Sequence, residues 1–108
     1  MKLQSLKIPV GWYIQDNKFY DIPATKENVE NIEMYFLEDI LQLTNEYRNR
    51  LLDLGWYPEG DFENGSFKLV VYDGDFNGNL LFEYSSKNKD DVTSMINNVL
   101  WQITSGGL

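Results

Sequence analysis

The sequence predicts an α+β fold, a mostly antiparallel sheet of about five strands with two helices in the order β-β-α-β-β-β-α. Several short segments alternate apolar with other residues, as half-buried strands do. Two other segments repeat apolar residues at spacings of three and four, as amphipathic helices do. The expected links between consecutive strands are short, which favours antiparallel pairing. At 108 residues the chain has the length of a single domain, residues 1–108.

The first expected element is a hairpin of two strands. Residues 6–14 alternate apolar and other side chains, and Trp12 falls on the apolar side, so we expect it to be mostly buried. Asp16 and Asn17 suit a two-residue turn because both residue types tolerate positive φ. Residues 18–22 would then return as the second strand.

A long helix is expected next, between residues 25 and 54. Apolar residues recur there at helical spacing: Val29, Ile32, Phe36, Ile40, Leu43, Tyr47, Leu51 and Leu54. Gly55 fits the position that follows a helix, and Arg48 and Arg50 would lie near the negative end of the helix dipole. A helix of about 30 residues is long for a globular protein, so a break near residues 31–34 is the alternative.

The sequence of the C-terminal half predicts three extended segments and a helix. An extended segment begins at Gly55, a turn follows at Asn64-Gly65, and residues 67–72 and 80–84 form two strands joined by a tight turn. Asn88 or Ser86 would cap the last helix. Its apolar face comprises Val92, Met95, Ile96, Val99, Leu100 and Ile103, and Gly106-Gly107 would end it.

The charge of the chain is concentrated in its middle. The net charge is −8, with −4 in residues 26–54 and −4 in residues 55–75. Such an acidic field attracts a basic protein partner and repels nucleic acid and anionic membranes. The chain contains neither His nor Cys, which excludes disulfides, thiolate metal sites and a nucleophilic triad based on His.

Two features of the sequence indicate a cytoplasmic protein. The first seven residues lack the apolar stretch of a signal peptide. No apolar run approaches the length of a membrane span. We therefore expect a protein that acts inside the cell. We also expect no cofactor.

The segment 73–79 resembles the start of a calcium loop. Asp73, Asp75 and Asn77 would take its first three ligand positions, and Gly78 the sharp turn. The bidentate Glu of such loops is missing, because Tyr84 stands at position 12. We expect a hairpin turn and no metal site.

No catalytic residue is assigned from the sequence. The acidic pairs lie in expected turns or on polar helix faces, where carboxylates are solvated. Acid–base catalysis needs two carboxylates whose environments separate their pKa values, usually by burial. Ser66 and Lys68 could in principle form a Ser-Lys pair, but nothing near them supplies an oxyanion hole.

The segment 56–65 combines three aromatic residues with three acids. We expect Trp56 and Phe62 to anchor this loop on the core. The outward residues would form a protein interface, where aromatic and charged side chains carry much of the binding energy. Together with the next acidic turn, the expected partner-binding residues are Tyr57, Glu59, Asp61, Glu63, Asp73 and Asp75.

The segments Leu6–Ile14, Asn17–Asp21, Gly55–Asp61 and Phe67–Tyr72 together resemble small acidic bacterial immunity proteins. Such proteins are encoded beside contact-dependent growth-inhibition or other polymorphic toxins. The resemblance implies a cytoplasmic, non-enzymatic protein that binds one cognate toxin domain and blocks its active site or its access to substrate. Many such toxins are basic nucleases, which suits an acidic inhibitor. It assigns no functional residue, because immunity proteins share a role more than a sequence.

Two other functions remain open at this point. The first is an acidic mimic of nucleic acid, or a phage-type inhibitor of a host nuclease, whose carboxylates would be spaced like phosphates. The second is a small hydrolase that uses carboxylates, which an acidic pair buried in a pocket with raised pKa would favour.

Overall fold

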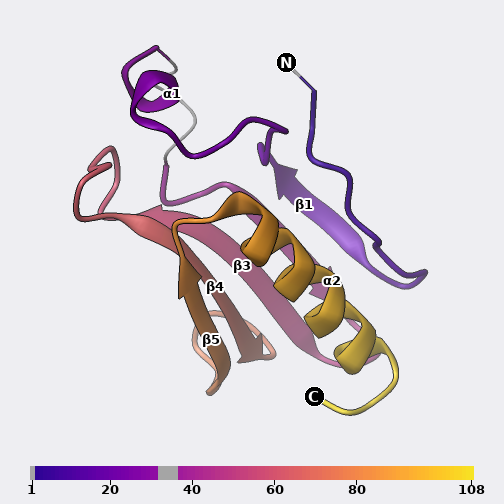
Figure 1. Ribbon diagram of the computed structural model, residues 1–108. Helices are drawn as coiled ribbons and strands as arrows, with labels where there is room; N and C mark the ends of the chain where they lie inside the picture. The colour runs from indigo at the N-terminus through magenta and orange to yellow at the C-terminus, as the bar shows by residue number, and fades with distance from the viewer. Residues whose placement is uncertain (1, 32–36) are drawn as a thin grey trace.

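A five-stranded antiparallel sheet forms the centre of the protein, with the strands in the order β1-β2-β3-β4-β5 (Figure 1). The structure, a computed structural model, describes residues 2–31 and 37–108. Its elements are β1 (Tyr13–Asn17), α1 (Lys26–Asn31), β2 (Leu41–Asn45), β3 (Arg50–Tyr57), β4 (Ser66–Asp73), β5 (Leu80–Ser86) and α2 (Lys89–Thr104). The α+β class, the antiparallel sheet and the two helices are confirmed. The order along the chain is β-α-β-β-β-β-α, which differs from the expected order.

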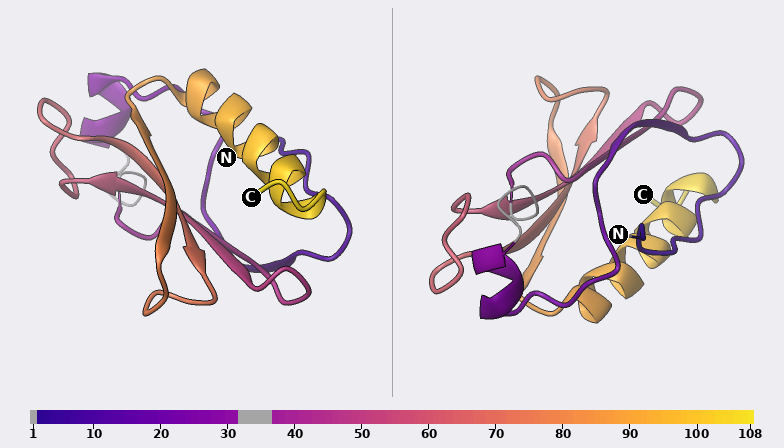
Figure 2. Two further views of the ribbon diagram at one scale, coloured as in Figure 1. Left: turned by 90° about the horizontal axis from the view of Figure 1, so that it is seen from below. Right: turned by 90° about the horizontal axis from the view of Figure 1, so that it is seen from above.

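The core lies between α2 and one face of the sheet (Figure 2). Because successive strand residues point to opposite faces, every second residue of the central strands faces the helix. The buried sheet residues of this core include Leu41, Leu43, Leu52, Leu54, Trp56, Phe67, Leu69 and Val71. From α2, five residues enter it: Val92, Ile96, Val99, Leu100 and Ile103.

Among the described residues, neither helix packs on the opposite face of the sheet, which we call the helix-free face. It comprises the alternate residues of the same strands, among them Gln42, Thr44, Leu51, Asp53, Gly55, Tyr57, Lys68, Val70 and Tyr72. Leu51, Asp53 and Val70 are buried there, although no helix covers them.

The predicted N-terminal hairpin is wrong. Residues 13–17 form β1, which includes the expected turn residues and pairs with β2. Residues 6–12 run beside α2 without joining the sheet, and the backbone N–H of Lys7 donates to the Asn97 side chain at 2.8 Å. Val10 is 99% exposed, so the alternation did not mark a buried face. Trp12 is half-buried, and its Nε1 donates to Thr104 Oγ1 at 3.0 Å.

The predicted long helix is also wrong. The short helix α1 ends at Asn31, and the stretch that follows contains the hairpin of β2 and β3. Its turn is closed by Asn45 Oδ1, which accepts from the N–H of Arg48 at 2.9 Å, and by Asn49 with φ of 57°. Tyr47, assigned to the apolar helix face, is 87% exposed in this turn. The break expected near residues 31–34 falls mainly on residues outside the described ranges.

Gly55 lies inside β3 instead of ending a helix. The segment before β2 crosses it closely, and a Cβ on Gly55 would lie 2.1 Å from the carbonyl oxygen of Glu38. The N–H of Trp56 donates to the Leu37 carbonyl at 2.8 Å, and the N–H of Ile40 donates to the Leu54 carbonyl at 3.0 Å. Glycine is therefore required by a close approach of two backbones.

The two strands and the capped helix expected in the C-terminal half are confirmed, whereas the extended segment expected to begin at Gly55 is the end of β3, which begins at Arg50. β4 and β5 cover the two expected strands, and the N–H of Asp73 donates to the Asn79 carbonyl to close the turn between them. Asn88 caps α2 by accepting from the N–H of Asp91 at 3.0 Å. Gly106, with φ of 87°, follows the end of the helix.

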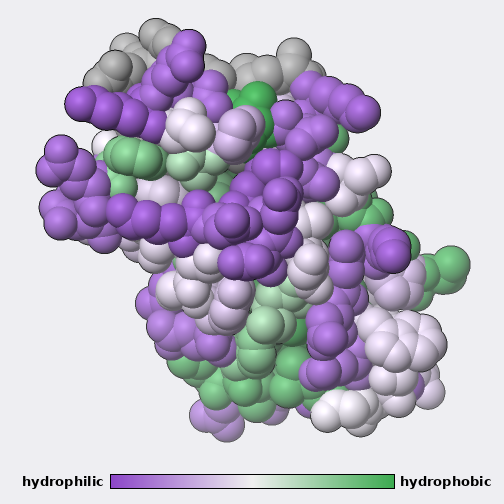
Figure 3. All heavy atoms as spheres, viewed as in Figure 1, coloured by the Kyte–Doolittle hydropathy of each residue, from purple (hydrophilic) through white to green (hydrophobic). Residues whose placement is uncertain are grey.

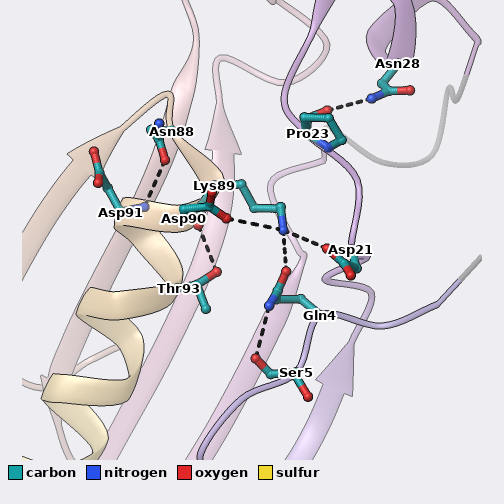
Figure 4. Close-up of polar contacts among 10 residues, drawn as sticks. All are labelled: Gln4, Ser5, Asp21, Pro23, Asn28, Asn88, Lys89, Asp90, Asp91 and Thr93. Atoms are coloured by element: carbon teal, nitrogen blue, oxygen red, sulfur yellow. Dashed lines mark hydrogen bonds and ion pairs between the residues drawn. The ribbon is translucent and has the colours of Figure 1, made fainter.

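Polar contacts tie both ends of α2 to the rest of the protein. At its start, Lys89 Nζ donates to Gln4 Oε1 and to Asp21 Oδ1, the latter at 2.8 Å (Figure 4). At its end, Arg48 Nη2 donates to the Thr104 carbonyl at 3.0 Å. Arg48 therefore does meet the negative end of a helix dipole, but that of α2 and not of a helix containing it.

Candidate partner-binding surface

The loop of residues 58–65, between β3 and β4, is fixed to the core by aromatic rings. Trp56 is fully buried, and Phe62 stacks parallel to it with ring centroids 6.4 Å apart. Phe67 packs edge-on against Trp56 at 5.0 Å. The expectation that Trp56 and Phe62 anchor this loop is confirmed.

Hydrogen bonds inside the loop hold its backbone in one conformation. Asp61 Oδ1 accepts from the N–H of Asn64 at 3.1 Å, and Asp61 Oδ2 accepts from its side-chain Nδ2 at 3.2 Å. These bonds hold the pKa of Asp61 below its usual value. The N–H of Gly65 donates to the Asp61 carbonyl at 2.8 Å, and a Cβ on Gly65 would overlap the Trp56 ring.

Lys87, which directly follows the end of β5, holds the loop in place. Its Nζ donates to the carbonyls of Phe62 and Glu63 at 3.1 and 2.7 Å. The same ammonium lies 5.3 Å from the centre of the Phe62 ring. Lys87 thus binds backbone oxygens and leaves the Glu63 carboxylate directed to solvent, since Glu63 is exposed.

Three expected partner-binding residues lie exposed at this end of the sheet. They are Tyr57, at the end of β3, and Glu59 and Glu63 in the loop. Figure 3, which views the α2 side, shows hydrophilic residues over the part of the surface where this loop lies. The carboxylate of Asp61, by contrast, is hydrogen-bonded to Asn64 within the loop. Asp61 therefore helps to shape the loop.

The two acidic turns do not form one cluster. β4 runs from Ser66 to Asp73 and separates them, and eight strand residues span about 25 Å. Asp73 Oδ1 accepts from Arg50 Nη1 at 2.8 Å, so this charge is paired. Asp75 is exposed, and its Oδ1 accepts from the N–H of Asn77 at 2.8 Å. The sequence groups the acids of both turns in one site because their spacing along the chain does not show that the two turns lie at opposite ends of a strand.

The resemblance to a calcium loop does not extend to its side-chain geometry. Asp73 binds Arg50, and Asp75 caps its own turn. Among the residues the structure describes, no group of three or more His, Cys, Asp or Glu could hold a metal ion.

A pocket on the helix-free face was not anticipated from the sequence. It has a volume of about 180 Å³, and Asp53, Tyr57, Lys68, Val70, Tyr72 and Phe76 line it. Phe76 belongs to the β4–β5 turn and packs on the Tyr72 ring at 5.6 Å. The sequence signal for it is the acid in the apolar run of β3, but that run also fits the apolar spacing of a helix, which hides the burial of Asp53.

Asp53 is the one buried carboxylate among the described residues, with 5% of its surface exposed. Burial raises its pKa to about 7, and the charge of Asp39 contributes in the same direction. The pKa of Tyr57 is raised to about 12, first by burial and then by the charge of Asp53. Asp39 itself is exposed, so the described residues contain no buried pair of carboxylates.

The possible Ser-Lys pair finds no catalytic arrangement. Lys68 Nζ lies 3.4 Å from Glu83 Oε1 and 5.7 Å from the centre of the Tyr57 ring. Ser66 stands opposite Tyr57 at the end of the strand pair. Lys68 thus pairs with an acid and an aromatic ring, as a surface lysine on a sheet commonly does.

Comparisons with known proteins leave the family open: no family model matches the chain, and neither a curated protein nor a solved structure matches it. Within the described ranges, no helix is long and apolar enough to cross a membrane.

Proposed function

We propose that this protein is a non-enzymatic inhibitor, an immunity protein that neutralises a cognate toxin domain by stoichiometric binding in the bacterial cytoplasm. The observation that carries the proposal is the rigid loop beside the helix-free face. Its core anchors point inward, while Tyr57, Glu59 and Glu63 are exposed. An exposed tyrosine with exposed carboxylates at the same end of the sheet has the composition of a binding surface for a basic protein.

The rigidity of the loop supports a binding role. Phe62, Asp61 and Lys87 restrain it by ring stacking, side-chain caps and bonds to its carbonyls. A loop that is already ordered loses little conformational entropy when a partner binds. The loop can therefore contribute affinity without the cost of ordering it in the complex.

The charge of the chain supports a basic partner. A net charge of −8 on 108 residues produces a field that accelerates encounter with a positive surface. Basic nuclease domains are the toxins that this charge suits best. The same field disfavours nucleic acid and anionic membranes as partners.

The alternative is an acidic mimic of nucleic acid that inhibits a host nuclease. Such a mimic presents a row of carboxylates on one surface. Here the two acidic turns lie at opposite ends of β4, and Asp73 is paired with Arg50. This arrangement favours an interface around one loop over a continuous acidic row.

A carboxylate hydrolase is the weakest of the three functions. Its mechanism needs a second carboxylate beside the one with the raised pKa. Asp53 supplies a buried acid, but Asp39, whose charge acts on it, is exposed. A single buried acid can equally serve as a binding group.

Co-expression with the gene immediately upstream tests the proposed function. If that gene encodes the toxin, the wild-type protein should restore growth and co-purify with the toxin domain in a one-to-one complex. Growth that stays inhibited, with no complex on size-exclusion chromatography, would contradict it. Binding to several unrelated host nucleases would favour the mimic instead.

A further inference from the structure

The pocket on the helix-free face is lined by a carboxylate, that of Asp53, and by aromatic side chains. Asp53 lies on β3 opposite Val70 of β4 and Gln42 of β2, in the middle of the sheet. The rings of Tyr57 and Tyr72, with Phe76 from the β4–β5 turn, surround the space above it. The volume of about 180 Å³ is that of several water molecules, enough for the end of one long side chain.

The Asp53 carboxylate has no partner among the described residues. The hydrogen bonds and ion pairs of this part of the chain do not include its side chain, although 95% of the residue is buried. The nearest lysine of the pocket, Lys68, pairs with Glu83 on β5 instead. No buried side-chain oxygen or nitrogen of the described residues lacks a hydrogen-bond partner, so the Asp53 oxygens open onto the pocket, where a donor or cation can reach them.

The charged groups around the pocket favour a cation. Glu38 and Asp39, on the segment before β2, act on Tyr57 or Asp53 through their charges. Lys68 of β4 also lines the pocket; its ammonium is paired with Glu83 of β5 and lies 5.7 Å from the centre of the Tyr57 ring. Apart from Lys68, which is paired with Glu83, the charged groups that act on Asp53 and Tyr57 are carboxylates.

We propose that this pocket receives an arginine side chain of the protein partner, whose guanidinium pairs with Asp53 between the tyrosine rings. The inference rests on the proposed function and names its central contact. A guanidinium fits this lining better than an ammonium, because it stacks on aromatic faces and binds a carboxylate through two parallel N–H groups. The arginine would give the Asp53 carboxylate a charged partner inside the pocket.

A free peptide tests the pocket without the toxin. The probe is the blocked tripeptide acetyl-Gly-Arg-Gly-amide, compared with its citrulline twin, which has the same shape but no charge. Amide chemical shifts of the ¹⁵N-labelled protein are followed during each titration. With the arginine peptide we expect saturable shifts at Asp53, Tyr57, Lys68 and Tyr72, and with the citrulline peptide at least fivefold weaker binding.

The protonation of Asp53 gives a second readout. Ionised Asp53 binds a guanidinium, so affinity should rise roughly tenfold from pH 6 to pH 8. Asp53→Asn, which keeps the size of the side chain, should lose both the binding and its pH dependence. Asp90→Asn, a change at an exposed acid on α2, should leave them unchanged.

Two outcomes would overturn the inference. One is equal binding of the citrulline peptide, which would show that charge is not recognised. The other is the absence of shifts at the pocket while Asp53→Asn and the wild type are both folded by circular dichroism. Neither outcome depends on growth rescue. The peptide titration therefore tests this contact, and the co-expression experiment tests the immunity function independently.

Discussion

The rings of Trp56 and Phe62 lie parallel, with planes 1° apart and centroids 6.4 Å apart. One ring is in the core and the other in the loop that carries Glu59 and Glu63. The stack therefore connects the stability of the fold to the shape of the candidate interface.

Replacement of Phe62 by Ala should loosen the loop without unfolding the protein. Phe62 is half-buried, so we expect a loss of about 1–3 kcal/mol, below the 3–5 kcal/mol of a fully buried Phe. Hydrogen exchange should accelerate at the amides of Asn64 and Gly65, whose bonds depend on this loop. Tyr47→Ala removes an exposed ring from another turn and is the control. Unchanged exchange in the loop of Phe62→Ala would show that the stack does not hold it.

Asp53 should make the stability of the protein depend on pH. Its pKa is raised from 3.8 to about 7 in the folded state, so the folded state binds more protons than the unfolded state between these values. The free energy of unfolding should therefore fall as pH rises from about 4 to 7, and then level off. The total is on the order of 2–4 kcal/mol, at about 1.4 kcal/mol per pKa unit.

Asp53→Asn should remove this part of the pH dependence and stabilise the protein at pH 8. Urea denaturation of both proteins at several pH values measures the effect. Asp90→Asn, at an exposed acid, is the matched control and should keep the wild-type profile. If wild type and Asp53→Asn had parallel profiles between pH 4 and 8, Asp53 would not be a buried acid.

Lys89 should hold the N-terminal segment against the start of α2. Its side chain is 10% exposed and donates to Gln4 and Asp21. In Lys89→Met, amide exchange should accelerate at Gln4 and Asp21, whose N–H groups pair residues 2–4 with 19–21. Lys7→Met, at an exposed lysine, is the control.

The Lys89 contact also gives a pH effect of the opposite sign. Lys89 lowers the pKa of Asp21, so the contribution of this pair is present above the unfolded value of 3.8 and is lost as pH falls through the folded value. In Lys89→Met, the free energy of unfolding should fall less than in the wild type as pH drops below 3.8. If the variant lost as much stability at low pH as the wild type, other carboxylates would account for that loss.

The sequence predicted the C-terminal half well because each signal there was local. Asn88 caps α2, and the apolar spacing of this helix has no competing interpretation. The β4–β5 hairpin has plain alternation and a turn rich in Gly, Asn and Asp. In these segments propensity, pattern and packing agree.

The sequence predicts the wrong structure for the middle of the chain because two periods fit it. Leu41 and Leu43 of β2, and Leu52 and Leu54 of β3, alternate as strand residues, yet the same stretch also satisfies a spacing of three and four. The asparagines at positions 45 and 49 form the turn and were the signal that could have decided it.

The candidate site was only partly accessible to sequence reasoning. The anchoring role of Trp56 and Phe62 followed from their size. The capping role of Asp61 and the burial of Asp53 depend on hydrogen bonds and strand register, which composition does not encode. The separation of the two acidic turns likewise follows only from the course of β4.

The turn of residues 73–79 should not bind calcium specifically. Asp73 is paired with Arg50, and Asp75 caps Asn77, so neither carboxylate is available without loss of a native contact. Calorimetry with millimolar calcium should show no saturable heat. A site of micromolar affinity would require the turn to rearrange and would disprove this interpretation.

The measurement that tests the central claim most directly is surface plasmon resonance against the cognate toxin domain at several salt concentrations. The wild-type on-rate should fall as salt rises, because screening shortens the Debye length from about 10 Å at 0.1 M to about 3 Å at 1 M. Glu59→Gln with Glu63→Gln should lower the on-rate at least fivefold at low salt. Asp90→Asn with Asp91→Asn removes the same charge from the exposed start of α2 and should change it less than twofold. Equal on-rates for both folded double variants would contradict an interface at this loop.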